Sequence, residues 1–408
     1  MNRTRFALFI LLGAAWLGEM GARRAAAQPA PLGSEIRVDT LAGDQFPSSP
    51  VLAVQPGGDF EIAWGYGASQ PAQIFSRHFA AGGDPTDAAQ VLIGSQGYYP
   101  LADAVTATPK GFDVLWHVVN DLRPEAPAFY RRHLSPLGVP DPGKPVHLGG
   151  KGIEWVWNVR GNGFMAGSPL LHAHGIAAQH LASSGRPTGP ELRLNSRRVD
   201  DPDTVVLAVA DGGFVAVWSG AVPVRGSTAR AVLRARRFSP AGKPLGPDFD
   251  VNSIVPGPGG GEPFLHPDFA VAAAPDGGFV VAWTLADTLY LRFFDAAARP
   301  LGPEVAALTT DDTIAPESMA FDPAGNLLVL WLVLLQDPFR TDLQIQLFDA
   351  HGAPLGPPEG VSSAASDRYR QPFRGSVEWV RDSWLVAWAA QVEDLEPSAI
   401  FVRRFAGN

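Results

Sequence analysis

The residues best suited to ligand recognition stand between the apolar segments of the chain. Arg368-Tyr369-Arg370 combines two guanidinium groups with an aromatic ring, and these residue types dominate the energetics of many binding surfaces. Similar stretches hold five further candidates: Tyr98, Tyr99, Arg198, Asp203 and His266. Together these eight side chains offer hydrogen bonds, ion pairs and ring contacts, so we predict them as the binding residues.

Clustered carboxylates are the only residues that suggest catalysis. The clusters are Asp200-Asp201 with Asp203, Asp311-Asp312, and Glu393-Asp394 with Glu396. Two carboxylates held a few ångströms apart across a cleft hydrolyse glycosides, but sequence alone gives no separation. Acids solvated in loops are the alternative interpretation, and no catalytic residue is assigned.

Two histidines raise the question of a metal site. His172 and His174 would face the same side of a strand, and His180 is nearby in sequence. No third ligand is fixed by the spacing, so neither a metal nor a cofactor is predicted.

A repeated strand pattern must position these residues. An apolar strand, a glycine-rich turn and Phe-x-x-x-Trp recur in seven copies, and the clearest is Phe214 to Trp218. The third copy keeps Phe164 but has Ser168 in place of tryptophan. The steps between these positions are 52, 52, 50, 65, 48 and 57 residues, and a period near 50 suits a four-stranded propeller blade.

The second half of each copy is also regular. A strand ending in Arg-x-Phe leads into a turn with Pro-Leu-Gly-Pro, as in Arg236 to Pro247. Apolar residues occupy both faces of the strands, as expected for stacked sheets. After residue 28 we find no long segment with helical periodicity, so the chain is predicted to be all-β.

The two ends of the chain predict a closed ring. The last copy contains three strands, ending with Ile400 to Phe405, and lacks a fourth. Residues 35–40 are predicted to form an extra strand of the fourth-strand type before the first copy. We therefore predict a seven-bladed β-propeller whose last blade is closed by the N-terminal strand, which removes exposed sheet edges.

The recurrent tryptophans are interpreted as packing between adjacent sheets. Six of the eleven tryptophans occupy the same repeat position, where a large core filler uses one partner for its N–H. Trp155, Trp157 and Trp379 fall outside that position, in predicted first strands, and are better candidates for binding.

The repeat unit resembles that of bacterial secreted β-propeller repeat proteins. Asp276 to Trp283, Asp349 to Gly356 and Phe249 to Asn252 carry this likeness, which covers residues 34–408. The resemblance implies the fold, and it implies no activity because these proteins share none. The Ser-x-Asp-x-Gly-x-x-Trp boxes of sialidase-like propellers are absent from the sequence, and the turns hold one carboxylate each, unlike integrin-like calcium loops.

The first 27 residues are predicted to be a signal peptide. Arg3 and Arg5 precede an apolar run over residues 7–17, and Ala25-Ala26-Ala27 places the cleavage before Gln28. The run is too short to cross a bilayer, and no later segment is long enough, so no membrane span is predicted. Residues 28–408 are then a single secreted propeller domain, with the ring starting near residue 34.

Charge and cysteine content narrow the possible partners. Removing four arginines and one glutamate with residues 1–27 leaves 28 basic and 40 acidic residues, a net charge of −12. Such an acidic chain is not expected to bind nucleic acid, which needs clustered lysine and arginine. With zero cysteines, packing alone must stabilise the fold. We expect a monomer.

Location indicates where function resides. Loops between second and third strands, and between blades, share one face and vary in length; they cover residues 41–50, 94–102, 196–204, 253–268, 284–288, 309–317, 332–341, 362–373 and 389–398. Variable loops on a rigid scaffold are the usual place for binding. We therefore predict a non-catalytic scaffold for an extracellular protein or envelope glycan. The alternative is an extracellular glycan hydrolase or lyase that uses loop carboxylates at the central funnel.

Overall fold

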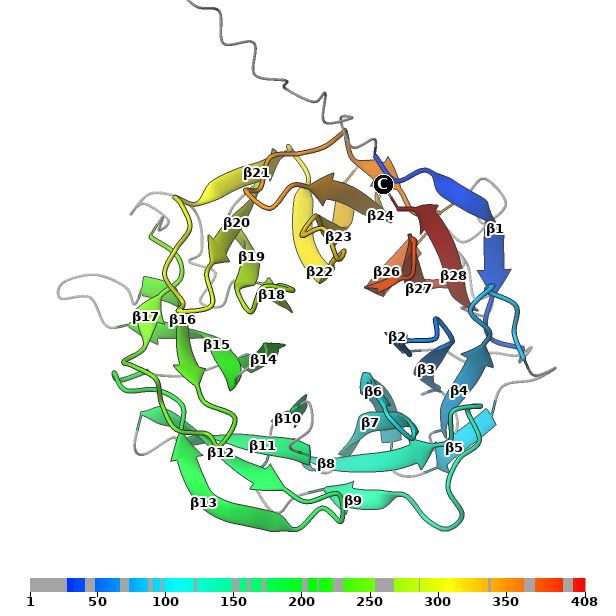
Figure 1. The fold of residues 1–408 in the computed structure, drawn as a ribbon, viewed down its shortest axis with the longest axis horizontal. Helices are drawn as coiled ribbons and strands as arrows, with labels where there is room; N and C mark the ends of the chain where they lie inside the picture. Colours follow the sequence, from blue (N-terminus) through cyan, green and yellow to red (C-terminus); the bar gives the residue numbers. More distant parts are fainter. Residues whose placement is uncertain are drawn as a thin grey trace, which may run out of the picture.

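The described residues form a closed ring of seven β-sheets (Figure 1). The computed structural model describes residues 28–40, 48–66, 73–86, 91–95, 98–120, 123–148, 153, 155–159, 163–170, 174–199, 205–210, 213–222, 230–253, 268–285, 287–336, 339–362, 371–391 and 399–407. Each sheet has four antiparallel strands, and no helix occurs within these ranges. The predicted all-β, seven-bladed propeller is confirmed.

The strands follow chain order from the inside of each blade outward. Blade 1 contains β2 (Val51–Val54), β3 (Phe60–Tyr66), β4 (Gln73–Phe79) and β5 (Val91–Ser95). Blade 2 contains β6 (Tyr98–Thr108), β7 (Gly111–Asn120), β8 (Arg123–Leu134) and β9 (Val146–Leu148). Blade 3 contains β10 (Trp155–Val159), β11 (Gly163–Leu170), β12 (Gly175–Leu181) and β13 (Pro187–Arg193). Blade 4 contains β14 (Val205–Ala210), β15 (Gly213–Val222), β16 (Arg230–Phe238) and β17 (Phe249–Asp250). Blade 5 contains β18 (Phe269–Ala273), β19 (Phe279–Leu285), β20 (Thr288–Phe294) and β21 (Val305–Thr309). Blade 6 contains β22 (Thr313–Phe321), β23 (Leu327–Gln336), β24 (Phe339–Phe348) and β25 (Glu359–Gly360). Blade 7 contains β26 (Gln371–Val380), β27 (Ser383–Gln391), β28 (Ala399–Ala406) and, as its outer strand, β1 (Pro31–Arg37).

The N-terminal strand closes the ring on the last blade, as predicted. β1 pairs antiparallel with β28, and Ile36 lies opposite Val402. Beyond the strand, the Asp39 carboxylate accepts a hydrogen bond from the Ile400 N–H at 3.0 Å. Asn195 and Asn252 accept the same bond from third-strand N–H groups in blades 3 and 4, so the closing strand uses the device of an ordinary fourth strand.

The repeated tryptophans fill the spaces between blades. Each packs against the blade before it, as Trp283 does with Val215, Val217 and Leu233 of blade 4. The side chain of Trp283 is almost fully buried, and its ring stacks on Tyr290 at 5.7 Å between centroids. We expected each indole N–H to have one hydrogen-bond partner. At five of the six positions the buried N–H has no acceptor among the described residues. Packing therefore accounts for their placement.

The arginine of Arg-x-Phe is an interblade clamp. It stacks over the phenylalanine two residues later, at 5.6 to 5.8 Å from the ring centroid in four blades. Its guanidinium then donates to a carbonyl at the end of the preceding blade, as Arg77 does to Val38 at 2.7 Å. The equivalent bonds are Arg132 to Ile93, Arg236 to Leu194, Arg292 to Val251, and Arg403 to Val361.

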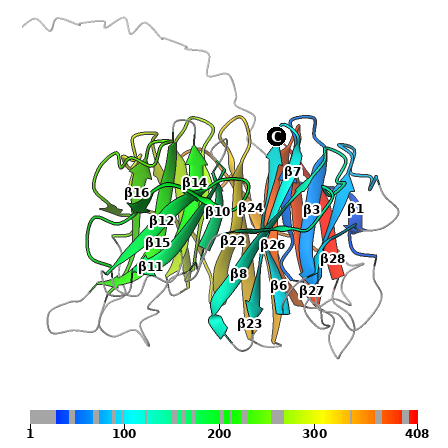
Figure 2. The same cartoon turned by 90° about the horizontal axis from the view of Figure 1, so that it is seen from below.

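The strand directions define two faces of the ring, seen edge-on in Figure 2. The connections from first to second strands and from third to fourth strands lie on one face. We call the opposite face the loop face: there the first strands begin, the second strands end, and the blade-to-blade connections lie. Within the described ranges no helix is long and apolar enough to cross a membrane.

Candidate functional site

Three inner strands carry a charged residue at a β-bulge near the loop face. The pairing register shifts at Asp103 in β6, at Glu317 in β22 and at Arg374 in β26. Each bulge adjoins the position paired with the repeat tryptophan of the second strand, so the three residues lie at the same level of the ring. A bulge leaves its extra residue outside the ladder and redirects its side chain, a common arrangement beside binding sites.

Glu317 lies among charged groups from neighbouring blades. Burial raises the pKa of its carboxyl, against the opposing effects of the Arg374 charge and a hydrogen bond from the backbone of Gly375. The nearby carboxylate of Asp268, just before β18, raises this pKa further. Charges from blades 5, 6 and 7 therefore converge here, and we call Asp268, Glu317 and Arg374 the axial cluster.

Arg374 is held in an unusual backbone conformation. Its φ is +54°, in the left-handed region that costs a non-glycine residue about 1 kcal/mol or more. The side chain is nevertheless exposed. The left-handed conformation coincides with the register shift at this residue, so the bulge accounts for it.

A second titratable pair lies on blade 2 at the same level. His117 Nδ1 and Asp103 Oδ1 are joined by a 2.7 Å hydrogen bond, and the two side chains are only 19% and 23% exposed. Burial raises the pKa of Asp103, although the bond to His117 opposes the rise. The second oxygen of Asp103 is buried and has no partner among the described residues. This pair can hold or transfer a proton.

Most of the binding residues predicted from sequence lie outside the described part of the chain. Arg368, Tyr369 and Arg370 come immediately before β26 but are not described, and neither are Asp203 and His266. Tyr98 and Tyr99 are the first residues of β6, at the loop face, and only their backbone is described. Their predicted roles stay predictions.

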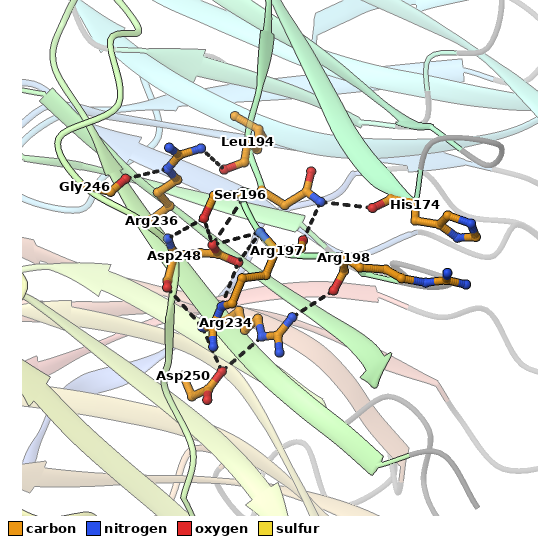
Figure 3. Close-up of polar contacts among 11 residues, drawn as sticks. His174, Leu194, Ser196, Arg197, Arg198, Arg234, Arg236, Gly246, Asp248 and Asp250 are labelled. Atoms are coloured by element: carbon orange, nitrogen blue, oxygen red, sulfur yellow. Dashed lines mark hydrogen bonds and ion pairs between the residues drawn. The ribbon is translucent and has the colours of Figure 1, made fainter. Parts of the chain in front are cut away.

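Arg198 lies beside a network of arginines and aspartates between blades 3 and 4 (Figure 3). Its carbonyl accepts a hydrogen bond from Arg234 at 3.0 Å, while its own side chain is exposed and points away from the network. Asp250 joins Arg197 and Arg234 at 3.0 Å each. Partial burial opposes ionisation of Asp250, but these two arginines hold its pKa below the ordinary value. The network joins two blades and gives the loop a structural role.

The histidine interpretation needs one correction. His174 has a φ of +49° and sits in the turn before β12, so it is not part of a strand, and His172 lies outside the described residues. The His174 carbonyl accepts a hydrogen bond from Asn195, which ties the turn to the fourth strand of the blade. No group of three or more metal-binding side chains occurs in the described ranges.

Trp379 has a structural role. Its ring meets Trp384 edge-on, at 4.8 Å between centroids and 76° between planes. Trp155 and Trp157 do lie in a first strand, β10, where they pair with Gly167 and Met165. Their side chains are not described.

The axial cluster was not singled out from the sequence, although a signal for it exists. An acidic residue follows proline just before or within the first strands of three successive blades, at Pro202-Asp203, Pro267-Asp268 and Pro316-Glu317. Proline is placed readily at a strand start. The acids that follow it at residues 268 and 317, which the structure describes, lie near the loop-face ends of β18 and β22. This recurrence could have identified the cluster.

Comparisons with known proteins give matches among solved structures alone. No family model matches the chain, and no curated protein matches it. Among solved structures, a protein of unknown function from Dyadobacter fermentans is 10% identical, with a TM-score of 0.49 over 93% of this chain and 99% of that one. An alpha-L-arabinanase from Penicillium chrysogenum is also 10% identical, with a TM-score of 0.48 over 92% and 99% of the two chains. The β-propeller domain of the Trilobed protease from Pyrococcus furiosus is 8% identical, with a TM-score of 0.48 over 89% and 94%.

Proposed function

We propose that this protein is a secreted, non-catalytic binding scaffold that holds an envelope glycan at the loop face, at the inner edge of blades 5 to 7. The observation that carries the proposal is the axial cluster, where an exposed guanidinium, an exposed carboxylate and a partly buried carboxyl meet. Sugar hydroxyls are both donors and acceptors, so they match a set that offers both. Charged groups also form the stronger hydrogen bonds.

The position of the cluster supports the same proposal. Arg374 lies four residues after Arg370, at the start of the inner strand that follows the Arg368-Tyr369-Arg370 segment. That segment lies outside the described residues, and we propose that its tyrosine ring stacks on a sugar face of the same ligand. Export, as the N-terminal 27 residues suggest, would place the protein beside such glycans.

The test is calorimetric titration with purified envelope polysaccharides. Arg374→Gln and the double variant Arg368→Ala/Tyr369→Ala should each weaken binding by at least about tenfold, as removal of a central contact does. Glu378→Gln is the matched control, because Glu378 is an exposed acid near the far end of the same strand, β26. Unchanged affinity in both test variants would refute this site.

A glycan hydrolase or lyase is the second candidate, and one observation favours it. A general acid needs a raised carboxyl pKa near a second carboxylate, and Glu317 beside Asp268 meets both conditions. The two acids come from adjoining blades, 5 and 6. On this reading Glu317→Gln still binds the glycan but releases no new reducing ends. A wild-type protein that releases none from any bound glycan excludes this candidate.

A further inference from the structure

Blade 3 departs from the repeat at two positions that face blade 2. Ser168 occupies the tryptophan position, and Gln179 occupies the position of the clamp arginine. The neighbouring Phe164 and Ala166 pack with Leu115 and Phe129 of blade 2, whereas Met165 packs with blade 4. Since side chains alternate along a strand, Ser168 also faces blade 2.

The second departure removes the clamp at the same boundary. Gln179 donates its amide N–H to Gly189 of its own blade at 3.2 Å, and so it does not reach the preceding blade. Blade 6 also has glutamine at this position, Gln346, but it retains Trp331. Only between blades 2 and 3 are the indole and the guanidinium both replaced.

A cavity of about 180 Å³ lies against blade 3 at these two positions, lined by residues of blade 3 and by Ile153, and we call it the interblade cavity. Ser168, Ala166, Ala177 and Gln179 line its wall, and the exposed Pro187 and Glu191 on β13 mark its open side. An engineered apolar cavity of about 150 Å³ binds benzene, so this volume accommodates an aromatic ring.

The boundary is held together without filling the cavity. Arg131 of blade 2 lies over the Phe164 ring of blade 3 at 5.4 Å, and it is paired with Asp113 at 2.6 Å. The contact of Arg131 with Phe164 therefore joins blades 2 and 3 at a boundary that has no repeat indole.

We propose that the interblade cavity binds a small aromatic amine of about indole size. The alanines provide the flat apolar wall. The Ser168 hydroxyl can donate or accept, whereas the Gln179 amide oxygen and the Glu191 carboxylate are acceptors. These two acceptors favour a ligand that donates hydrogen bonds and carries positive charge. This site is separate from the axial cluster and does not rest on the function proposed there.

The experiment is calorimetric titration of the full chain with three probes that share one ring. Tryptamine is cationic, indole is neutral and indole-3-acetate is anionic. Tryptamine should bind most tightly and indole-3-acetate least. Glu191→Gln should weaken tryptamine binding by about twofold to fivefold, the range for an exposed ion pair, and leave indole unchanged. Glu378→Gln removes the same charge from blade 7 and should change neither.

Ser168→Trp restores the repeat residue and should abolish binding of all three probes. A melting temperature equal to or above that of the wild type shows that the variant is folded with the cavity filled. If that variant does not fold, Ser168→Leu serves the same purpose with a smaller side chain. The absence of tryptamine binding by the wild type, or binding that survives in the folded Ser168 variant, overturns the proposal.

Discussion

Replacing Trp283 with serine should reproduce, between blades 4 and 5, the opening that Ser168 leaves between blades 2 and 3. Trp283 is almost fully buried against Val215, Val217 and Leu233, and those neighbours belong to rigid sheet ladders. They cannot move far into the vacated space without breaking strand pairing. A cavity should therefore persist in the variant.

The size of the natural cavity sets the expected loss of stability. With about 180 Å³ of space and a cost of about 24 cal/mol per Å³ of residual cavity, Trp283→Ser should lower the free energy of unfolding by about 4 kcal/mol. Urea unfolding followed by tryptophan fluorescence and circular dichroism measures this loss. Trp379→Ser is the matched control, because the half-buried Trp379 should cost only about 1 to 2 kcal/mol.

A small effect would refute the reasoning. If Trp283→Ser costs less than about 1 kcal/mol, the neighbouring sheets collapse into the space, and the missing indole does not account for the interblade cavity. Indole added to the folded variant gives a second readout, since a persistent cavity should let it recover part of the lost stability.

Three further results are expected. Arg77→Gln removes the bond to the Val38 carbonyl where the ring closes, and should cost about 1.5 to 3 kcal/mol in urea unfolding; an unchanged midpoint would show that the clamp contributes nothing. Burial, and then the adjacent Asp39, raise the pKa of Tyr66, so its contribution to stability is present below the unfolded value of about 10 and is lost as pH rises above it. Phenolate absorbance should show one tyrosine that ionises only on alkaline unfolding, and normal titration of all tyrosines in the folded protein would contradict this. Burial raises the pKa of Glu317 in the folded protein above the value of about 4.3 in the unfolded chain. The contribution of Glu317 to the free energy of unfolding is therefore fully present below about pH 4.3 and is lost as pH rises through its folded-state pKa. Glu317→Gln should therefore be more stable than the wild type at pH 7 and no more stable at pH 4, and parallel pH profiles would argue against the shift.

The fold was predictable because the sequence pattern of each blade lies within a short, continuous segment of the chain. Phe214 to Trp218 and Arg236 to Phe238 show the second and third strands of one blade within a short segment. The pairing of β1 with β28 followed from counting the strand missing in the last copy. Repetition supplied seven versions of the same information, and a drifted copy could be recognised against the others.

The candidate site was less predictable because it depends on convergence between blades. Asp268, Glu317 and Arg374 are each about one repeat apart in sequence, and they meet only after the ring has closed. The bulges at Glu317 and Arg374 are register shifts that no propensity reveals. The Arg-x-Phe arginine was recognised as a motif, but its role across the blade boundary required the geometry of the preceding sheet.

The pairing of β1 with β28 also governs when the protein can fold. The Asp39 carboxylate and its partner at Ile400 are 361 residues apart, so the first strand has no proper neighbour until the final segment of the chain has been synthesised. A growing chain can assemble single blades from local hairpins, but β1 stays unpaired until β28 has been synthesised. Ring closure is thus a late, slow step with a high entropic cost. In a chain truncated before residue 399, β1 would be an unpaired strand that could pair with a strand of another copy.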